Sequence, residues 1–246
     1  MAAVTIDGTG TVATQGSSAG ALTIKSTTLT VSSSATVLVA LLGLGGGSST
    51  ITSVTWDTST QTMTQLATIN STVGTASMSI YGLLSPHIGN LILNATWTGA
   101  KSSDLIGLSF FNSATDTIAN CFPNTTTKSS NGANASITVT SKTSDIAVSG
   151  FCQSAVNFVS INQTQIWLDN SHNASAGARS SGAATVTFTC SDGGASTPYA
   201  AAAVDISGPL TTTSEDQYHQ PWSSIGRKIY MIATRPLDGE IGIRTG

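Results

Sequence analysis

The sequence predicts an all-β protein folded as a two-sheet antiparallel β-sandwich. Ser and Thr make up 75 of the 246 residues, and Thr favours strands whereas Ser favours turns. Short segments in which apolar and polar residues alternate recur along the chain, each bounded by Gly, Asn, Asp or Ser. No segment carries a sustained 3.6-residue apolar stripe, so we expect neither long helices nor βαβ units.

Charge is scarce, which excludes two classes of function. Only 9% of the residues are charged, against about 25% in an ordinary soluble protein, while the 39% hydrophobic content is too high for a disordered Ser/Thr-rich chain. The net charge is −3 and no basic cluster exceeds the Arg227–Lys228 pair, so we expect no nucleic-acid binding. The longest apolar run, residues 35–45, is shorter than the roughly 20 residues of a spanning helix, so we expect no membrane insertion.

The expected strands follow one another with turn residues between them. Residues 36–42 form a continuous apolar run, typical of a strand buried on both faces, and a glycine hinge follows it. Residues 77–83 and 91–97 alternate as half-buried strands around a turn in which Pro86 and Gly89 supply the constrained and permissive backbone positions. The complete set of expected strands is 22–25, 28–31, 36–42, 51–56, 62–67, 77–83, 91–97, 104–111, 136–140, 145–151, 165–168, 184–189 and 200–206.

Two stretches depart from this pattern. Residues 112–135 form an irregular connection, which we expect at an edge or end of the sandwich. After Gly208 charged residues become about three times as frequent. Residues 1–208 contain 13 of them, whereas the much shorter stretch 209–246 contains 8. We therefore expect a sandwich domain over 1–208 and a linker with an extended C-terminal arm over 209–246. That arm is too short to bury a core of its own, so its apolar residues are expected to pack on the main domain or on another chain: Trp222, Ile229, Tyr230, Met231 and Ile232.

The three cysteines do not predict a metal site. Cys121, Cys152 and Cys190 lack CxxC spacing and a nearby His, so we expect buried free thiols. A Cys152–Cys190 disulfide between strand ends, or an intermolecular bridge, is the alternative. The N-terminus has no basic residue and no apolar centre of a signal peptide, so export by the general secretory route is not expected.

No catalytic, cofactor or metal site is predicted. A GxSxG match places Ser18 as a nucleophile, but it lacks the strand-turn-helix context of that motif. Both glutamates lie in the arm, which leaves no obvious acid pair, and the loop 169–173 with His172 reads as a polar turn rather than a calcium loop. His87 projects from the 85–90 turn with no partner nearby in sequence. Aromatic residues that would stack on a sugar or fill the core are Trp56, Trp97, Trp167 and Tyr81.

The order of segments from residue 36 to residue 207 resembles a module of tailed-phage virion proteins and bacterial surface proteins. The likeness lies in VLVALLGLGG, ITSVTWDTSTQTMTQLA, SMSIYGLLSPHIGNLILNATW, DLIGLSFFNSATDT and AAAAVDISG. It covers about two thirds of the chain and implies a jelly-roll-like β-sandwich that displays, decorates or binds and is not an enzyme.

That resemblance leads to two expectations about function. The first is a non-enzymatic virion structural protein of a tailed phage, a capsid decoration or head-fibre subunit at the virion surface, assembled in the host cytoplasm. Its partners would be further copies of itself, in a homotrimer or other small symmetric oligomer, and a capsid or tail protein. The alternative is a carbohydrate- or receptor-binding module of a tail fibre or surface protein, with a surface glycan as ligand.

Overall fold

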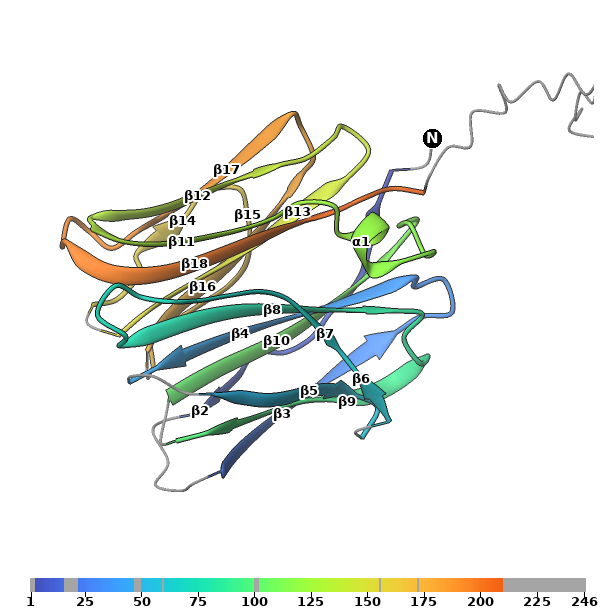
Figure 1. Ribbon diagram of the computed structural model, residues 1–246, viewed down its shortest axis with the longest axis horizontal. Coiled ribbons are helices and arrows are strands. Elements are labelled where there is room, and N and C mark those ends of the chain that lie inside the picture. The colour runs from blue at the N-terminus through green and yellow to red at the C-terminus, as the bar shows by residue number, and fades with distance from the viewer. Residues whose placement is uncertain are drawn as a thin grey trace, which may run out of the picture. The chain divides into compact units, whose positions relative to one another are not determined.

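The computed structural model describes residues 3–15, 22–46, 50–58, 60–99, 102–154, 156–171 and 173–209. The chain separates into two units, Met1–Pro209 and Leu210–Gly246, and the second lies outside the described residues. Strands of the first unit form four stacked antiparallel sheets (Figure 1). The all-β prediction is therefore confirmed, although the described residues build four sheets rather than two.

The first half of the unit contributes two of these sheets, which we call A and B. Sheet A has the order β1-β10-β4-β8-β7, and β2 also pairs with β10; sheet B has the order β3-β9-β5-β6. Their bounds are β1 Thr5–Thr9, β2 Ala13–Gln15, β3 Leu22–Val31, β4 Val37–Gly45, β5 Ile51–Trp56, β6 Gln61–Thr62, β7 Thr64–Asn70, β8 Ala76–Leu84, β9 Gly89–Thr98 and β10 Ser102–Phe111.

The second half contributes sheets C and D. Sheet C has the order β11-β18-β13-β16-β15 and sheet D the order β12-β17-β14. A short helix, α1 (Ile118–Cys121), precedes them. The bounds are β11 Thr125–Gly132, β12 Asn134–Thr140, β13 Ile146–Gln153, β14 Ser160–Ile161, β15 Thr164–Asp169, β16 Ala174–Ser181, β17 Thr185–Ser191 and β18 Thr197–Ile206.

Each half follows the strand order of a jelly roll, in which strands 1-8-3-6 form one sheet and 2-7-4-5 the other. Both β1 and β2 pair with β10, so they are counted together as the first strand, and β6 and β7 are counted as one bent fifth strand. Sheet A then reads 1-8-3-6-5 and sheet B reads 2-7-4-5. Sheet C repeats 1-8-3-6-5 and sheet D repeats 2-7-4. The unit is therefore a tandem of two jelly rolls.

Strand registers make the two jelly rolls comparable residue by residue. Val37 pairs with Phe110 in sheet A, as Ile146 pairs with Ile206 in sheet C. A register shift follows Gln65 where β7 pairs with β8, and another follows Gln165 where β15 pairs with β16. Because even the bulges coincide, each position in sheet A has a defined counterpart in sheet C.

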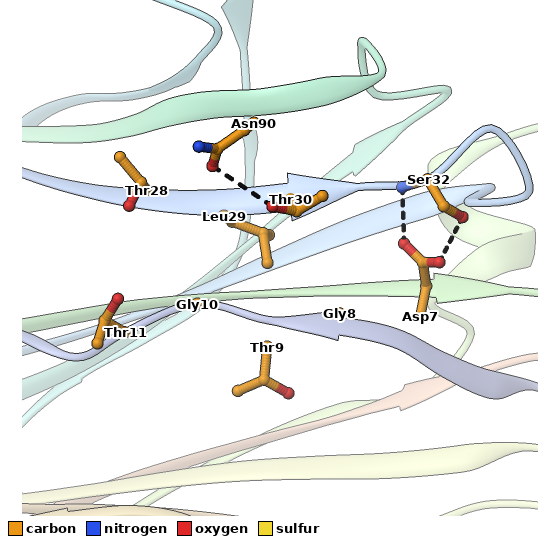
Figure 2. A pocket seen from close by; sticks show the side chains of 10 residues that line it. All are labelled: Asp7, Gly8, Thr9, Gly10, Thr11, Thr28, Leu29, Thr30, Ser32 and Asn90. Carbon is orange, nitrogen blue, oxygen red and sulfur yellow. Dashed lines mark hydrogen bonds between the residues drawn. The ribbon is translucent and has the colours of Figure 1, made fainter.

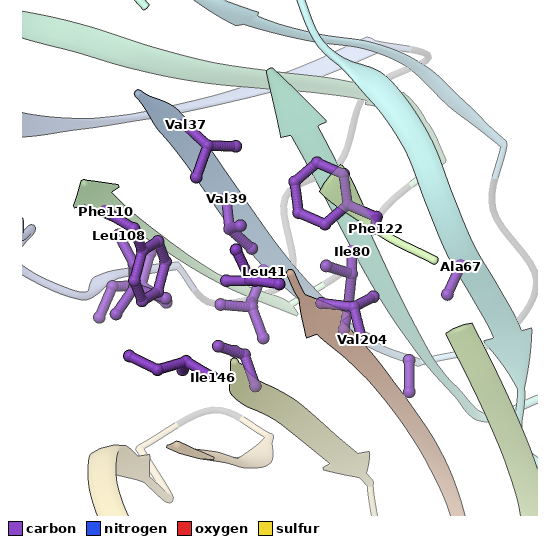
Figure 3. Close-up of a cluster of buried hydrophobic side chains, with 14 of the residues drawn as sticks. Val37, Val39, Leu41, Ala67, Ile80, Leu108, Phe110, Phe122, Ile146 and Val204 are labelled. Atoms are coloured by element: carbon purple, nitrogen blue, oxygen red, sulfur yellow. The ribbon is translucent and has the colours of Figure 1, made fainter. Parts of the chain in front are cut away.

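Three hydrophobic cores separate the four layers. One lies inside each jelly roll, between sheets A and B and between sheets C and D. The third joins the jelly rolls and is formed by the facing sides of sheets A and C (Figure 3). Val37, Leu41 and Phe110 contribute from sheet A, and Ile146 and Val204 from sheet C. The jelly rolls are thus joined through a mainly apolar interface, and the central strands β4, β10, β13 and β18 of sheets A and C are buried on both faces.

Most expected strands are present, with informative differences. Residues 22–31 form one strand instead of two, and the expected strand 62–67 is divided between β6 and β7. The irregular connection 112–135 contains α1 and also the edge strand β11, whose sequence TTTKSSNG carries no apolar residue. Strand β16 was missed because Ala, Gly and Ser fill it. Among the described residues, no helix is both long and apolar enough to cross a membrane.

Candidate functional site

A groove opens beside β1, where the edge strands of sheets A and B meet (Figure 2). Its volume is about 380 Å³. The backbones approach closely here, because a Cβ on Gly8 would lie 2.6 Å from the carbonyl oxygen of Thr30. Hydroxyl, amide and carboxylate groups dominate the lining, which consists of Asp7, Gly8, Thr9, Gly10, Thr11, Thr28, Leu29, Thr30, Ser32 and Asn90.

Asp7 is held rigidly at one end of this groove. Its Oδ2 accepts hydrogen bonds from the Ser32 backbone N–H at 3.0 Å and from Ser109 Oγ at 2.8 Å, and its Oδ1 accepts from Ser32 Oγ. Burial acts to raise the pKa of Asp7, but these hydrogen bonds outweigh it and lower the pKa from its usual value. Asp7 therefore stays ionised and supplies the groove with a fixed negative charge.

The outer face of sheet D is a ladder of hydroxyl groups, and Lys128 Nζ donates to Ser136 Oγ at its edge at 3.2 Å. Ser136, Thr138 and Thr140 on β12 lie opposite Thr189, Thr187 and Thr185 on β17. The Thr138 and Thr187 side chains hydrogen-bond to each other at 2.9 Å.

Sheet B presents a similar outer face. Its exposed positions on β3 are Ser26, Thr28 and Thr30. Thr30 Oγ1 donates to Asn90 Oδ1 at 3.4 Å, and Ser26 Oγ donates to Asn94 Oδ1. Both outer layers of the stack therefore carry hydroxyl and amide groups.

His87 has a partner that the sequence did not reveal. Its Nδ1 lies 2.7 Å from Asp57 Oδ2, and its backbone N–H donates to Gln61 Oε1 at 2.7 Å. Trp56 Nε1 donates to the His87 carbonyl oxygen at 2.9 Å. Asp57 and Ser85 both have positive φ, 54° and 50°, which is uncommon for residues other than Gly. The pair shapes the connection between β8 in sheet A and β9 in sheet B, and no nucleophilic side chain joins it in the hydrogen bonds of the described residues.

A second polar group of residues lies inside the interface between the jelly rolls. Asp104 on β10 is 1% exposed, and its Oδ2 accepts from Ser175 Oγ at 2.6 Å. Ser175 Oγ in turn accepts from Trp167 Nε1 at 2.9 Å. Asn173 donates to Cys152 Sγ at 3.2 Å beside them. Burial raises the pKa of Asp104 to about 7, although the Ser175 hydrogen bond partly opposes this.

Several residues singled out in the sequence lie outside the described residues. These are the arm residues Trp222, Ile229, Tyr230, Met231 and Ile232, the candidate nucleophile Ser18 and the loop residue His172. In the rest of that loop, Asp169 Oδ1 accepts from the Ser171 N–H at 2.6 Å and Asn173 is buried, so its oxygens do not converge. No group of three or more His, Cys, Asp or Glu side chains suited to a metal occurs in the part of the chain described.

The aromatic residues take the core role. Trp56 and Trp97 are fully buried, Trp167 is 4% exposed and Tyr81 is 5% exposed. Tyr81, considered from the sequence as the best exposed ring, instead donates its hydroxyl to Gln65 Oε1 at 3.0 Å. None of these four rings is available to stack on a sugar.

The thiols Cys152 and Cys190 are both free and buried, as is Cys121. Cys152 faces the interface core and Cys190 faces the core of the second jelly roll, on different sides of sheet C. The Cys152–Cys190 bridge considered from the sequence is therefore not formed.

We expect all three thiols to be unreactive in the folded protein. Burial raises the pKa of each to about 12, so almost no thiolate is present at neutral pH, and a reagent would also need the core to open. Ellman's reagent should release colour from three thiols per chain only after unfolding in guanidinium. Rapid reaction of one thiol in buffer would contradict its burial, and Cys→Ser variants would identify which.

Comparison of the chain with protein-family models, with curated proteins and with solved structures finds no match.

Proposed function

We propose that the protein is a non-enzymatic structural protein of a tailed-phage virion, a capsid decoration or head-fibre subunit that displays its tandem jelly roll outward. Jelly rolls serve as capsid and lectin domains, but a fold alone does not assign a function. The proposal rests on one geometric feature, which is that the chain enters and leaves the described unit at the same end.

Hydrogen bonds tie both chain ends to a single turn. The Val4 N–H donates to the Ser144 carbonyl oxygen at 2.9 Å, and the Gly208 N–H donates to Asp145 Oδ1 at 2.9 Å. The N-terminus and the end of β18 accordingly lie together in Figure 1. A module attached through this end would project its other end away from the attachment point.

The opposite end carries exposed apolar loop residues. Val73, between β7 and β8, is 60% exposed, and Val159, between β13 and β14, is 66% exposed. Strand registers place these loops beside the far ends of β4 and β13, away from Val37 and Ile146. Ile88, in the connection after β8 at the end of the unit that holds Val37, is also 60% exposed. Single exposed apolar residues thus occur at both ends and do not by themselves mark a contact surface.

Deleting residues 209–246 tests the attachment role. The chain ending at Gly208 is expected to unfold cooperatively, because its three cores lie within residues 4–206. It should elute as a monomer and fail to bind purified capsids, whereas the full chain should form a small symmetric oligomer and bind. Gel filtration with light scattering, and co-sedimentation with capsids, measure the two properties.

The matched control is Val159→Ser in the full chain, at the opposite end of the unit. It should assemble and bind capsids like the unmodified chain. Full assembly by the truncated chain would overturn the role of the arm. Absence of the protein from purified virus particles, judged by mass spectrometry, would overturn the virion assignment itself.

A glycan-binding module is the second candidate, favoured by the polar groove beside β1. Its Asp7 carboxylate and the Asn90 amide are groups that hydrogen-bond sugar hydroxyls, although no aromatic ring lines the groove. A glycan array would test this, with Asn90→Ala as the variant. Binding that Asn90→Ala abolishes would support the module, and an array without signal would count against it.

A further inference from the structure

The two jelly rolls differ in one buried position at the end where the chain enters and leaves. In the first, Ser109 pairs with Leu38; in the second, the counterpart of Ser109 is Asp205, which pairs with Ala147. In the first jelly roll the Ser109 hydroxyl donates to Asp7, and both carboxylate oxygens of Asp7 accept hydrogen bonds. The jelly-roll fold therefore does not require a carboxylate at this strand position.

The second jelly roll places two carboxyl groups and a hydroxyl together at this position. Asp205 is fully buried, Asp145 is 3% exposed and Ser141 is 4% exposed. Both Ser141 and Asp145 contact the Asp205 carboxyl. Two buried side chains of the connection between β12 and β13 thus converge on a third, from β18.

Hydrogen bonds account for only part of this cluster. Asp145 Oδ1 accepts from the Gly208 N–H at 2.9 Å and from Ser144 Oγ at 3.1 Å. Asp205 Oδ2 accepts from Asn124 Nδ2 at 3.4 Å. Three buried oxygens have no hydrogen-bond partner: Asp145 Oδ2, Asp205 Oδ1 and Ser141 Oγ.

The negative charge is likewise uncompensated. No Lys, Arg or His of the described ranges forms an ion pair with either carboxyl, since the one ion pair there joins His87 and Asp57. Lys142 lies in the same turn, where its carbonyl oxygen accepts from the Asp145 N–H, but its exposed side chain forms no ion pair with either carboxyl. The Cys121 thiol, whose pKa is raised by burial and then by Asp116 and Asp205, supplies no positive charge either. Two adjacent buried carboxylates without a counter-charge are strongly unfavourable, so the cluster must take up either a proton or a cation.

We propose that Asp145, Asp205 and Ser141 bind a hard metal cation, with Ca²⁺ as the favoured ion. Two carboxylate oxygens and a hydroxyl are ligands that hard cations prefer. Ca²⁺ accepts flexible coordination, whereas Mg²⁺ demands a near-ideal octahedron and usually retains several waters, which is less suited to so buried a position. The Ser141 hydroxyl, which is buried close to the Asp205 carboxyl without hydrogen-bond geometry, is the observation that a carboxyl pair alone does not explain. A 180° rotation of the Asn124 amide would present a fourth oxygen.

The bound ion would fasten the chain where it leaves the jelly roll. Asp145 lies in the turn that holds Gly208 and adjoins Ser144, which holds Val4. A cation joining Asp145 to Asp205 on β18 would therefore stabilise the end of β18 and both connections to it.

Thermal unfolding of the full chain tests the site. After removal of metals with EDTA, Ca²⁺ at about 100 times its dissociation constant should raise Tm by several degrees. The rise should be larger at pH 8 than at pH 5, because the ligands must be deprotonated. Calorimetric titration should give one ion per chain, and Asp205→Asn should weaken the apparent affinity by about tenfold or more.

Three further variants show whether the response comes from this site. Asp7→Asn removes the carboxylate that accepts from Ser109, the counterpart of Asp205 in the first jelly roll. This control variant should leave the Ca²⁺ response unchanged. Ser141→Ala and Asp205→Ser, the latter copying Ser109, should weaken the response even if Asp205→Asn fails to fold. The proposal is overturned if Ca²⁺ has no effect at either pH, which would show that the carboxyl pair shares a proton. A response that survives Asp205→Asn would also overturn it, because the ion would then bind elsewhere.

Discussion

Raising the pH from about 5 to about 8 is expected to lower the free energy of unfolding by about 2–3 kcal/mol through Asp104 alone. The pKa of Asp104 is raised to about 7 in the folded protein, from about 3.8 when unfolded. A carboxyl whose folded pKa is raised stabilises the fold fully below the unfolded value, and this stabilisation is lost as the pH rises through the folded value. Urea unfolding at several pH values measures it.

The structural cause is the position of Asp104 between sheets A and C. Its Oδ2 has the Ser175 hydroxyl as a donor, but its Oδ1 has no partner. The counterpart of Asp104 in sheet C is Ala200, and the counterpart of Ser175 in sheet A is Met78. The same contact is apolar in its second copy, so ionisation of Asp104 is not required to join the jelly rolls.

Asp104→Asn provides the direct comparison. It retains the shape and cannot ionise, so the stability of the variant should change less between pH 5 and pH 8 than that of the unmodified protein. Asp205→Asn serves as a parallel variant, because burial and then Asp145 raise the pKa of Asp205 to about 6. An unchanged pH dependence in Asp104→Asn would show that this carboxyl remains ionised in the interface.

Alternation of apolar and polar residues predicted the strands where a sheet has one wet face. Residues 91–97 and 136–140 follow this pattern, with Leu93, Trp97 and Ile137 buried. The same logic failed for β16, whose burial depends on Ala and Gly fitting beneath larger neighbours. It failed for β11 because an edge strand of Thr and Ser has no apolar signal at all.

The tandem repeat of the jelly roll could not be predicted from the sequence, because the two halves have the same strand order and strand pairing but different residues. One local match exists: Thr64-Gln65 recur as Thr164-Gln165 at the same register of the corresponding strand. Asn70, the last residue of β7, recurs as Asn170, which directly follows β15. In a chain so rich in Thr such a match carries little weight. The functional clusters were hidden for a related reason, since Asp57 and His87, or Asp145 and Asp205, meet only through the fold.

The counterparts of one cross-strand pair exchange large and small residues. Ala67 pairs with Ile80 in sheet A, whereas Trp167 pairs with Gly177 in sheet C. A Cβ on Gly177 would lie 1.7 Å from Trp167 Cζ3, so the indole covers the glycine backbone directly. Both solutions fill a similar volume at the interface core, because a large side chain on either strand requires a small one on the other.

Gly177→Ala is therefore expected to destabilise the protein by about 3 kcal/mol, since the ring of Trp167 must leave its site. Trp167→Ala should cost about 3–5 kcal/mol by leaving a cavity and removing the donor to Ser175. The double variant Trp167→Ala/Gly177→Ile installs the Ala–Ile pair of the first jelly roll. Its loss in the free energy of unfolding should be about 2 kcal/mol smaller than the sum of the losses in Trp167→Ala and Gly177→Ile measured separately. Urea unfolding of the four chains measures this coupling. Additive losses would mean that the two jelly rolls, despite equal strand order, do not pack this position in equivalent ways.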